Sequence, residues 1–288
     1  MMRFLISLIV LLTTCFSAAR AEDWQAGQFV FSDWAGPPLR VFYLEPPAGA
    51  LPEAPVVIVM HGVNRNADDY RDNWRDLAQR YGLRVYAPEF SAADFPGAAL
   101  YNLGGVGRDG PSAYAALEPL FSAIARPGGE AQGYYLFGHS AGAQFVHRAL
   151  LFEDLPHLNT AYSANAGWYT LPDASQAWPY GTGGTPASED DIRRWVGMPL
   201  TILLGERDVD PRHQHLRHTP EAEAQGPHRY ARGLNFANAA RARADALGVT
   251  YGWRVGSVPG VAHDNAGMAE AAAWMIAADV RERAGEAE

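Results

Sequence analysis

The chain has 288 residues, of which 48% are hydrophobic and 19% charged, and its formal net charge at pH 7 is −9. This length and polarity suit one large globular core and exclude a wholly disordered chain. The negative charge argues against nucleic acid or an anionic membrane surface as the partner and favours a neutral substrate.

The first 21 residues have the pattern of a secretory signal peptide. Arg3 precedes an apolar run at residues 4–12, and a small-x-small triplet at residues 19–21 offers a cleavage site. The run is shorter than the roughly 20 apolar residues that a membrane-spanning helix needs. We therefore expect residues 1–21 to be removed, and the mature protein, residues 22–288, to be periplasmic or extracellular.

Cys15 is the only cysteine of the chain and lies in this leader. Lipid attachment at Cys15 is the alternative to cleavage after residue 21, although Thr14 stands where a smaller residue is usual. After cleavage no cysteine remains, so disulfides, cysteine nucleophiles and thiolate metal sites are excluded. The leader also removes two arginines, which leaves 21 basic against 32 acidic residues and a net charge of −11.

Short apolar runs alternate with helical patterns along the predicted mature chain. Strands are predicted at residues 28–31, 39–44, 56–60, 84–87, 134–137, 160–163, 200–204 and 250–255. Helices are predicted at residues 68–81, 113–125, 141–152, 234–247 and 268–283. This alternation indicates an α/β fold with a mostly parallel central sheet of about eight strands and helices on both faces.

The connections between these elements add two expectations. The Gly-Pro-Pro turn at residues 36–38 should join the first two strands as an antiparallel pair. Three connections, residues 90–112, 171–193 and 206–233, are longer than usual, and long loops in a compact domain are commonly functional. No linker divides the sequence, so residues 22–288 are expected to form a single domain.

The sequence Gly-His-Ser-Ala-Gly at residues 138–142 matches the nucleophile-elbow pattern G-x-S-x-G. Such an elbow is a strained turn that raises the serine hydroxyl above the sheet, and Gly138 and Gly142 remove side chains that would clash in it. The motif needs a strand before it and a helix after it, and both are predicted here. A plain Gly-Ser turn would need neither, so Ser140 is the predicted nucleophile.

The buried strand at residues 56–60 ends in His-Gly, followed by Val63 and Asn64. Acyl transfer requires N–H donors aimed at the carbonyl oxygen that becomes negative. In a fold with a nucleophile elbow, one donor is the residue after the serine, here Ala141, and the other comes from the loop after the third strand. We predict the backbone N–H groups of Ala141 and Val63, with Asn64 as the alternative to Val63. A plain strand-exit turn is the non-functional interpretation.

A serine hydroxyl needs a base, and the base needs an orienting acid. His263 lies in a Gly-bearing loop between the last predicted strand and the last helix, which suits a base that reaches over the sheet. Asp208 follows the strand at residues 200–204, at the edge of the sheet where ligands gather. Asp208 is the predicted acid, with Asp210 and Glu206 as nearby competitors.

Together these motifs resemble the α/β-hydrolase superfamily over essentially the whole predicted mature chain. The His-Gly loop and the Gly-Val-Ala-His-Asp ending at residues 260–264 are most similar to exported esterases grouped with polyhydroxybutyrate depolymerases and feruloyl esterases. The resemblance implies an α/β-hydrolase fold and ester hydrolysis without a cofactor. The sequence departs from the depolymerases at Val63, where they often carry a cysteine.

Two other motifs are weaker. The glycines at residues 105–110 satisfy G-x-G-x-x-G, but they lie in a predicted loop that runs into Pro111, so we expect no nucleotide cofactor. Histidines within residues 213–218 have spacing that could hold a metal ion, but arginine and glutamate residues around them favour a solvated loop. We therefore expect no metal.

The substrate pocket is predicted from residues near the elbow. Asn64 and His139 flank the predicted oxyanion hole and nucleophile, and Trp168 and Tyr169 follow the strand predicted at residues 160–163. The two aromatic residues could line an acyl or aryl pocket, and core packing is the equal alternative.

The sequence thus predicts a secreted carboxylic ester hydrolase with a Ser-His-Asp triad and an acyl-enzyme intermediate. A serine peptidase or amidase with the same triad is the alternative, and a binding protein on an inactive hydrolase scaffold is the second. The expected partner is a small-molecule or oligomeric ester, with no nucleic acid and no membrane once the leader is removed. The oligomeric state is left open.

Overall fold

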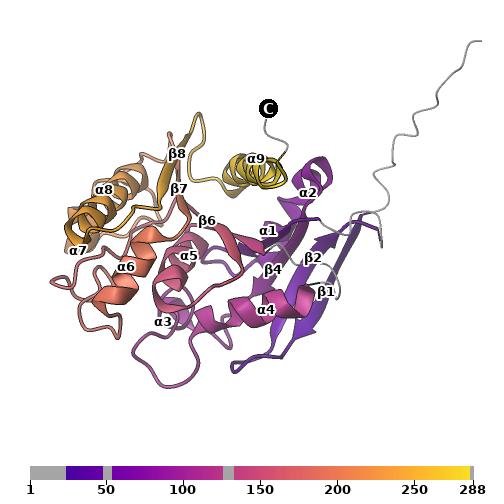
Figure 1. The fold of residues 1–288 in the computed structure, drawn as a ribbon, viewed down its shortest axis with the longest axis horizontal. Helices are drawn as coiled ribbons and strands as arrows, with labels where there is room; N and C mark the ends of the chain where they lie inside the picture. Colours follow the sequence, from indigo (N-terminus) through magenta and orange to yellow (C-terminus); the bar gives the residue numbers. More distant parts are fainter. Residues whose placement is uncertain (1–23, 48–53, 126–132, 286–288) are drawn as a thin grey trace, which may run out of the picture.

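A computed structural model describes residues 24–47, 54–125 and 133–285, so the predicted signal peptide lies outside the described residues. Eight strands form one sheet in the order β1-β2-β4-β3-β5-β6-β7-β8 (Figure 1). β1 (Gln25–Phe31) pairs antiparallel with β2 (Leu39–Glu45), which pairs antiparallel with β4 (Arg84–Glu89). The remaining strands are parallel: β3 (Val56–Met60), β5 (Tyr134–His139), β6 (Leu158–Ala164), β7 (Leu200–Gly205) and β8 (Arg254–Val258).

Helices cover both faces of this sheet (Figure 1). One face carries α1 (Ala67–Asp72), α2 (Arg75–Tyr81) and α9 (Asn265–Arg283). The other carries α4 (Leu117–Ile124), α5 (Ala141–Phe152), α6 (Glu189–Gly197) and α8 (Arg229–Leu247). Shorter helical segments are α3 (Gly97–Leu100), α7 (Pro220–Ala224) and a 3₁₀ turn at Ala113–Ala116. The α/β-hydrolase fold class predicted from the sequence is confirmed.

The β3 strand shows why the core has two layers. All five of its side chains are buried, as expected for a β-branched strand in the middle of a parallel sheet. Val56, Ile58 and Met60 contribute to the core on the α5 face, and Val57 and Val59 to the core on the α9 face. The apolar run therefore packs against helices on both sides, because successive side chains of a strand point to opposite faces.

Several boundaries differ from the predictions because tertiary packing overrides the local pattern. The helix predicted at residues 68–81 is two helices, α1 and α2, and the break holds Trp74, which is fully buried against Phe137 at a ring distance of 5.2 Å. The strand predicted at residues 250–255 begins only at Arg254, because Trp253 instead packs into the core and donates its Nε1–H to the Trp195 carbonyl.

The predicted bounds of two other helices also differ from the structure. The helix predicted at residues 113–125 opens as a 3₁₀ turn, and α8 starts at Arg229 instead of residue 234. The loop predicted at residues 171–193 contains the start of α6, whose capping box joins Ser188 and Asp191. Within the described ranges, no helix is long and apolar enough to cross a membrane.

We expect the protein to lose stability as the pH falls below about 6.5. Burial lowers the pKa of His61 to about 3, and it lowers the pKa values of His139 and His147 well below their ordinary value. The unfolded chain binds these protons near pH 6.5 while the folded chain does not, so this stabilisation is complete above pH 6.5 and is lost toward pH 3. Each proton contributes up to about 1.4 kcal/mol per pH unit.

Denaturant unfolding at several pH values between 7.5 and 5 measures this loss. His147 donates its Nδ1–H to the Ala143 carbonyl and accepts the N–H of Thr170, and a glutamine can approximate both contacts. His147→Gln should therefore flatten the pH dependence by up to one proton. An unchanged slope in this variant would contradict the assignment.

Candidate active site

Ser140 lies at a strained turn between β5 and α5, with φ +58° and ψ −113°. The turn is closely packed: a Cβ on Gly138 would lie 2.3 Å from the Gly142 carbonyl oxygen, and one on Gly142 would lie 2.1 Å from that of Met60. The Ser140 N–H donates to the carbonyl of Ala164 at 3.0 Å. The two elbow glycines are therefore required by space, and the turn is fixed against β3 and β6.

The structure brings the three predicted triad residues together. His263 Nε2 lies 3.1 Å from Ser140 Oγ, and His263 Nδ1 lies 2.8 Å from Asp208 Oδ2. The Asp208 carboxylate can only accept, so Nδ1 carries the proton and Nε2 is free to accept the serine proton. Asp208 is buried, and the His263 side chain is 13% exposed. The arrangement has the hydrogen bonds that general-base activation of a serine requires.

Asp208 has a second partner that could not be predicted from the sequence. The Arg229 guanidinium donates to Asp208 Oδ1 at 3.1 Å, and both side chains are almost fully buried. Its other terminal nitrogen donates to His213 Nδ1 at 3.2 Å. A buried carboxylate is costly unless it is paired and hydrogen-bonded, and Arg229 supplies both. No local motif signals this role, because Arg229 stands at the start of α8, remote in sequence from the acid.

Two further histidines flank the candidate base. The ring of His139 lies 4.6 Å from that of His263, and the ring of His213 lies 5.3 Å from it. Burial lowers the pKa of His139 and, with the nearby Arg229 charge, also that of His213. Both rings are therefore neutral at neutral pH. A protonated His263 can lie beside them without repulsion from a second positive charge.

The predicted oxyanion donors lie on two elements that meet at the elbow. Ala141 is the first residue of α5, and an N–H in the first turn of a helix has no acceptor within that helix. Val63 and Asn64 are exposed in the turn after β3, and Val63 is 60% exposed. The close contact between Met60 and Gly142 holds this turn beside the serine.

The buried side chain of His61 stabilises the same turn through hydrogen bonds. Its Nδ1–H donates to the Gly62 carbonyl at 2.9 Å, and its Nε2 accepts the N–H of Phe90 at 3.0 Å. The hydroxyl of Tyr101 donates to the His61 carbonyl at 2.6 Å. The lowered pKa keeps this imidazole neutral, which is the form that can donate and accept at once. The His-Gly pair in the sequence does not by itself indicate this role.

The four predicted pocket residues differ in burial: three are buried and one is exposed. His139 is buried beside His263, and its Nδ1 lies 3.2 Å from the hydroxyl of Tyr70. Tyr169 is fully buried and stacks on Phe236 at 4.5 Å, so it packs in the core. Trp168 is also buried; the guanidiniums of Arg148 and Arg217 lie 4.3 and 5.2 Å from its ring. Asn64 is solvent-exposed.

The two weaker motifs lie in loops of the described chain. Residues 105–110 form turns in which Gly105, Gly107 and Gly110 have positive φ, and no helix starts there. Among the described side chains, no group of three or more His, Cys, Asp or Glu is placed to hold a metal ion.

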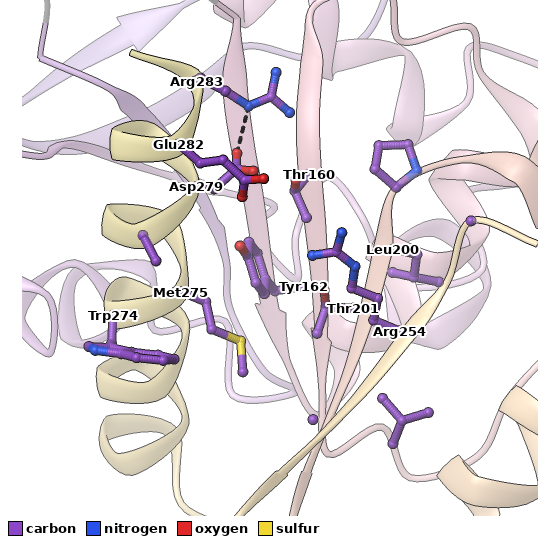
Figure 2. A pocket seen from close by; sticks show the side chains of 15 residues that line it. Thr160, Tyr162, Leu200, Thr201, Arg254, Trp274, Met275, Asp279, Glu282 and Arg283 are labelled. Atoms are coloured by element: carbon purple, nitrogen blue, oxygen red, sulfur yellow. Dashed lines mark hydrogen bonds and ion pairs between the residues drawn. The ribbon is translucent and has the colours of Figure 1, made fainter. Parts of the chain in front are cut away.

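A cavity of about 370 Å³ lies between α9 and strands β6 to β8 (Figure 2). Its strand residues include Thr160, Thr201 and Arg254, which stand in the amino-terminal halves of their strands. Figure 2 shows Met275 of α9 directed toward these strands. Ser140 follows the carboxyl end of its strand, and the carboxyl ends of parallel strands share one edge. The cavity is therefore separate from the site.

Comparisons with known proteins agree with this geometry. Residues 40–177 match the family model described as esterase PHB depolymerase. Poly(aspartic acid) hydrolase-1 from Sphingomonas sp. KT-1 is 39% identical with a TM-score of 0.83, over 87% of this chain and 98% of that one. LpqC, a poly(3-hydroxybutyrate) depolymerase from Bordetella parapertussis, is 36% identical with a TM-score of 0.80, over 88% and 89% of the two chains.

More distant structures share the fold alone. The fluorophosphonate-binding serine hydrolase FphF from Staphylococcus aureus is 14% identical with a TM-score of 0.61, over 90% of this chain and 99% of that one. Comparison with curated protein sequences gave no significant match.

Proposed function

The chain belongs to the esterase PHB depolymerase family of α/β-hydrolases, and we propose that it is a secreted carboxylic ester hydrolase with a Ser140–His263–Asp208 triad. Family membership makes it an esterase-type hydrolase. The observation that carries the finer proposal is the continuous line of hydrogen bonds, 2.8 and 3.1 Å, from Asp208 through His263 to Ser140.

In the proposed acylation step, Ser140 Oγ attacks the ester carbonyl carbon while His263 Nε2 takes the serine proton. Asp208 accepts a hydrogen bond from His263 Nδ1–H. This bond keeps the proton on Nδ1 before the reaction and stabilises the imidazolium that forms. The N–H groups of Ala141 and Val63 bind the oxyanion. The intermediate collapses as His263 gives its proton to the leaving alcohol. A water then attacks the acyl-enzyme carbonyl while His263 takes a proton from it. His263 returns this proton to Ser140 Oγ as the bond between Ser140 and the carbonyl carbon breaks and the carboxylic acid leaves.

Ser140→Ala should abolish hydrolysis of p-nitrophenyl esters while the fold stays intact, because no other described group stands where the hydroxyl does. Loss of a triad member leaves only the contribution of binding and the oxyanion hole. The measurement is kcat/KM for both proteins, with a fluorophosphonate probe as a second readout that should label the wild type alone. Activity within about tenfold of wild type would move the nucleophile elsewhere. An unlabelled, inactive wild type would favour the non-catalytic scaffold.

Asp208→Asn should lower kcat by up to about 10⁴, because the amide favours the wrong imidazole tautomer. Asp210 is exposed, and its carboxylate accepts the backbone N–H of Arg212 instead of facing His263. Asp210→Asn is therefore the matched control and should keep kcat within about threefold of wild type. Both variants are compared on one activated ester after circular dichroism has shown them folded. A crippled Asp210 variant beside a normal Asp208 variant would reverse the assignment.

An amide is the second candidate substrate, because one relative of 39% identity is a poly(aspartic acid) hydrolase. The same triad can cleave an amide if His263 protonates the leaving nitrogen. The net charge of the whole chain is negative, but the connection at residues 206–233, which carries Asp208, has exposed arginines that can pair with the carboxylates of such a polymer: Arg207, Arg212 and Arg217. Parallel assays on 3-hydroxybutyrate oligomers and poly(aspartic acid) separate the two, and we expect the ester to be preferred.

Export is part of the proposal and rests on the leader pattern at residues 1–21. The mature chain should begin at Glu22, because residues 19–21 form the best small-x-small site. N-terminal sequencing of the protein exported by a Gram-negative host measures this. A lipid-modified Cys15 at the new N-terminus would contradict it.

A further inference from the structure

The end of β6 is joined to the elbow and to the strand that leads to the acid. Ala164, the last residue of β6, accepts the N–H of Ser140 at 3.0 Å. The next residue, Asn165, donates its own N–H to the carbonyl of Leu203 in β7 at 2.9 Å. These two bonds are possible because β6 lies between β5 and β7 in the sheet.

The side chain of Asn165 extends this connection to the base. It is fully buried, and its Oδ1 accepts the N–H of Gly205 at 2.8 Å while its Nδ2 donates to the carbonyl of Ala262 at 2.9 Å. Gly205 ends the strand that precedes Asp208, and Ala262 immediately precedes His263. One amide therefore links the loops that carry Asp208 and His263 to the end of β6, whose last residue accepts the Ser140 N–H.

Asparagine suits this position for two physical reasons. Its φ is +51°, in the left-handed region that asparagine adopts more readily than most residues with a Cβ. Its amide also offers a donor and an acceptor at once, and their orientation is fixed because the Gly205 N–H can only donate and the Ala262 carbonyl can only accept. Glycine would keep the backbone and lose both bonds. Aspartate would keep the acceptor and lose the donor.

Other hydrogen bonds join the loop before α9, which carries His263, to the loop after β7, which carries Asp208. These bonds do not reach the turn at Ser140. The N–H of Arg207 donates to the Val261 carbonyl at 2.8 Å, and that of Glu206 donates to the Val258 carbonyl at 3.1 Å. These contacts would let the two loops move together relative to Ser140. The contacts of Asn165 oppose that motion, because its backbone neighbour Ala164 holds the elbow.

From this geometry we infer that Asn165 is a positioning residue, which sets the His263 imidazole against Ser140 Oγ. The inference rests on the proposed triad mechanism. Ala262 is covalently next to His263, so a shift of its carbonyl moves the ring. The His263–Ser140 contact of 3.1 Å is already near the long end of the normal hydrogen-bond range, so a further separation would take it out of that range. A misplacement of about 1 Å can cost about 10²-fold in rate.

The test compares Asn165→Gly and Asn165→Asp with the wild type on one p-nitrophenyl ester. We expect kcat to fall by about 10²-fold in both variants, with KM changed less than about twofold, because substrate binding is untouched. Asn165→Asp isolates the bond to Ala262, since it keeps the acceptor for the Gly205 N–H. A proton NMR spectrum of each protein follows the His263 Nδ1–H bonded to Asp208. This downfield resonance should shift or broaden in both variants.

Leu120→Ala serves as the control for lost stability, because Leu120 is a buried core residue of α4, outside the triad loops. It should lower the midpoint of unfolding while kcat and the NMR resonance stay unchanged. Asn165 variants with kcat within about threefold of wild type and an unchanged resonance would overturn the inference. An equal loss of kcat in Leu120→Ala would do so as well.

The NMR readout needs no substrate, so it separates this inference from the proposed function. A wild type that hydrolyses no ester but whose His263 resonance still depends on Asn165 would overturn the esterase proposal alone. An active wild type with insensitive Asn165 variants would overturn the positioning role alone.

Discussion

The structure depends on a turn at Ser140 that the chain would not adopt by itself. A residue with a Cβ at φ +58° is held in a sparsely populated region, which costs about 1–3 kcal/mol. The surrounding residues therefore have to hold it in place: the carbonyls of Met60 and His61, at the end of β3, pack against Gly142, and Ala164 of β6 accepts the serine N–H. The chain continues from β3 into the turn predicted to bind the oxyanion, and from β6 into Asn165. The contacts that hold Ser140 in its strained conformation therefore also position the turn after β3 and Asn165.

Arginine fixes the loops around this turn. The chain has no lysine, and its mature part is expected to have no cysteine. Arg65 donates to the carbonyls of Phe90, Phe95 and Gly97 in one long connection, and Arg232 donates to those of Gly167, Arg217 and Gly226 around another. A planar guanidinium offers five donors in a fixed geometry, which suits it to gather several carbonyls. Such contacts hold the loops where a disulfide could otherwise have done so.

Those features of the fold and site that depend on local pattern could be predicted from the sequence. The bounds of β3 and α5 were predicted without error, and Ser140, Asp208 and His263 meet because each follows the carboxyl end of a strand in one parallel sheet. Features that depend on distant partners could not be predicted. Arg229, Asn165 and the buried Trp74 act through contacts made only in the folded chain, and nothing in their neighbours along the sequence distinguishes them.

The charges of the candidate site balance only when Arg229 is counted with the three residues of the proposed triad. Its guanidinium cancels the buried charge of Asp208, so a protonated His263 would add one net positive charge. In the proposed mechanism, that charge appears together with the negative oxyanion, and the two offset each other. His139 and His213, with lowered pKa values, add no charge to this balance. A cluster of imidazoles around one serine is therefore compatible with the proposed mechanism, in which His263 alone takes the serine proton and passes it to the leaving group.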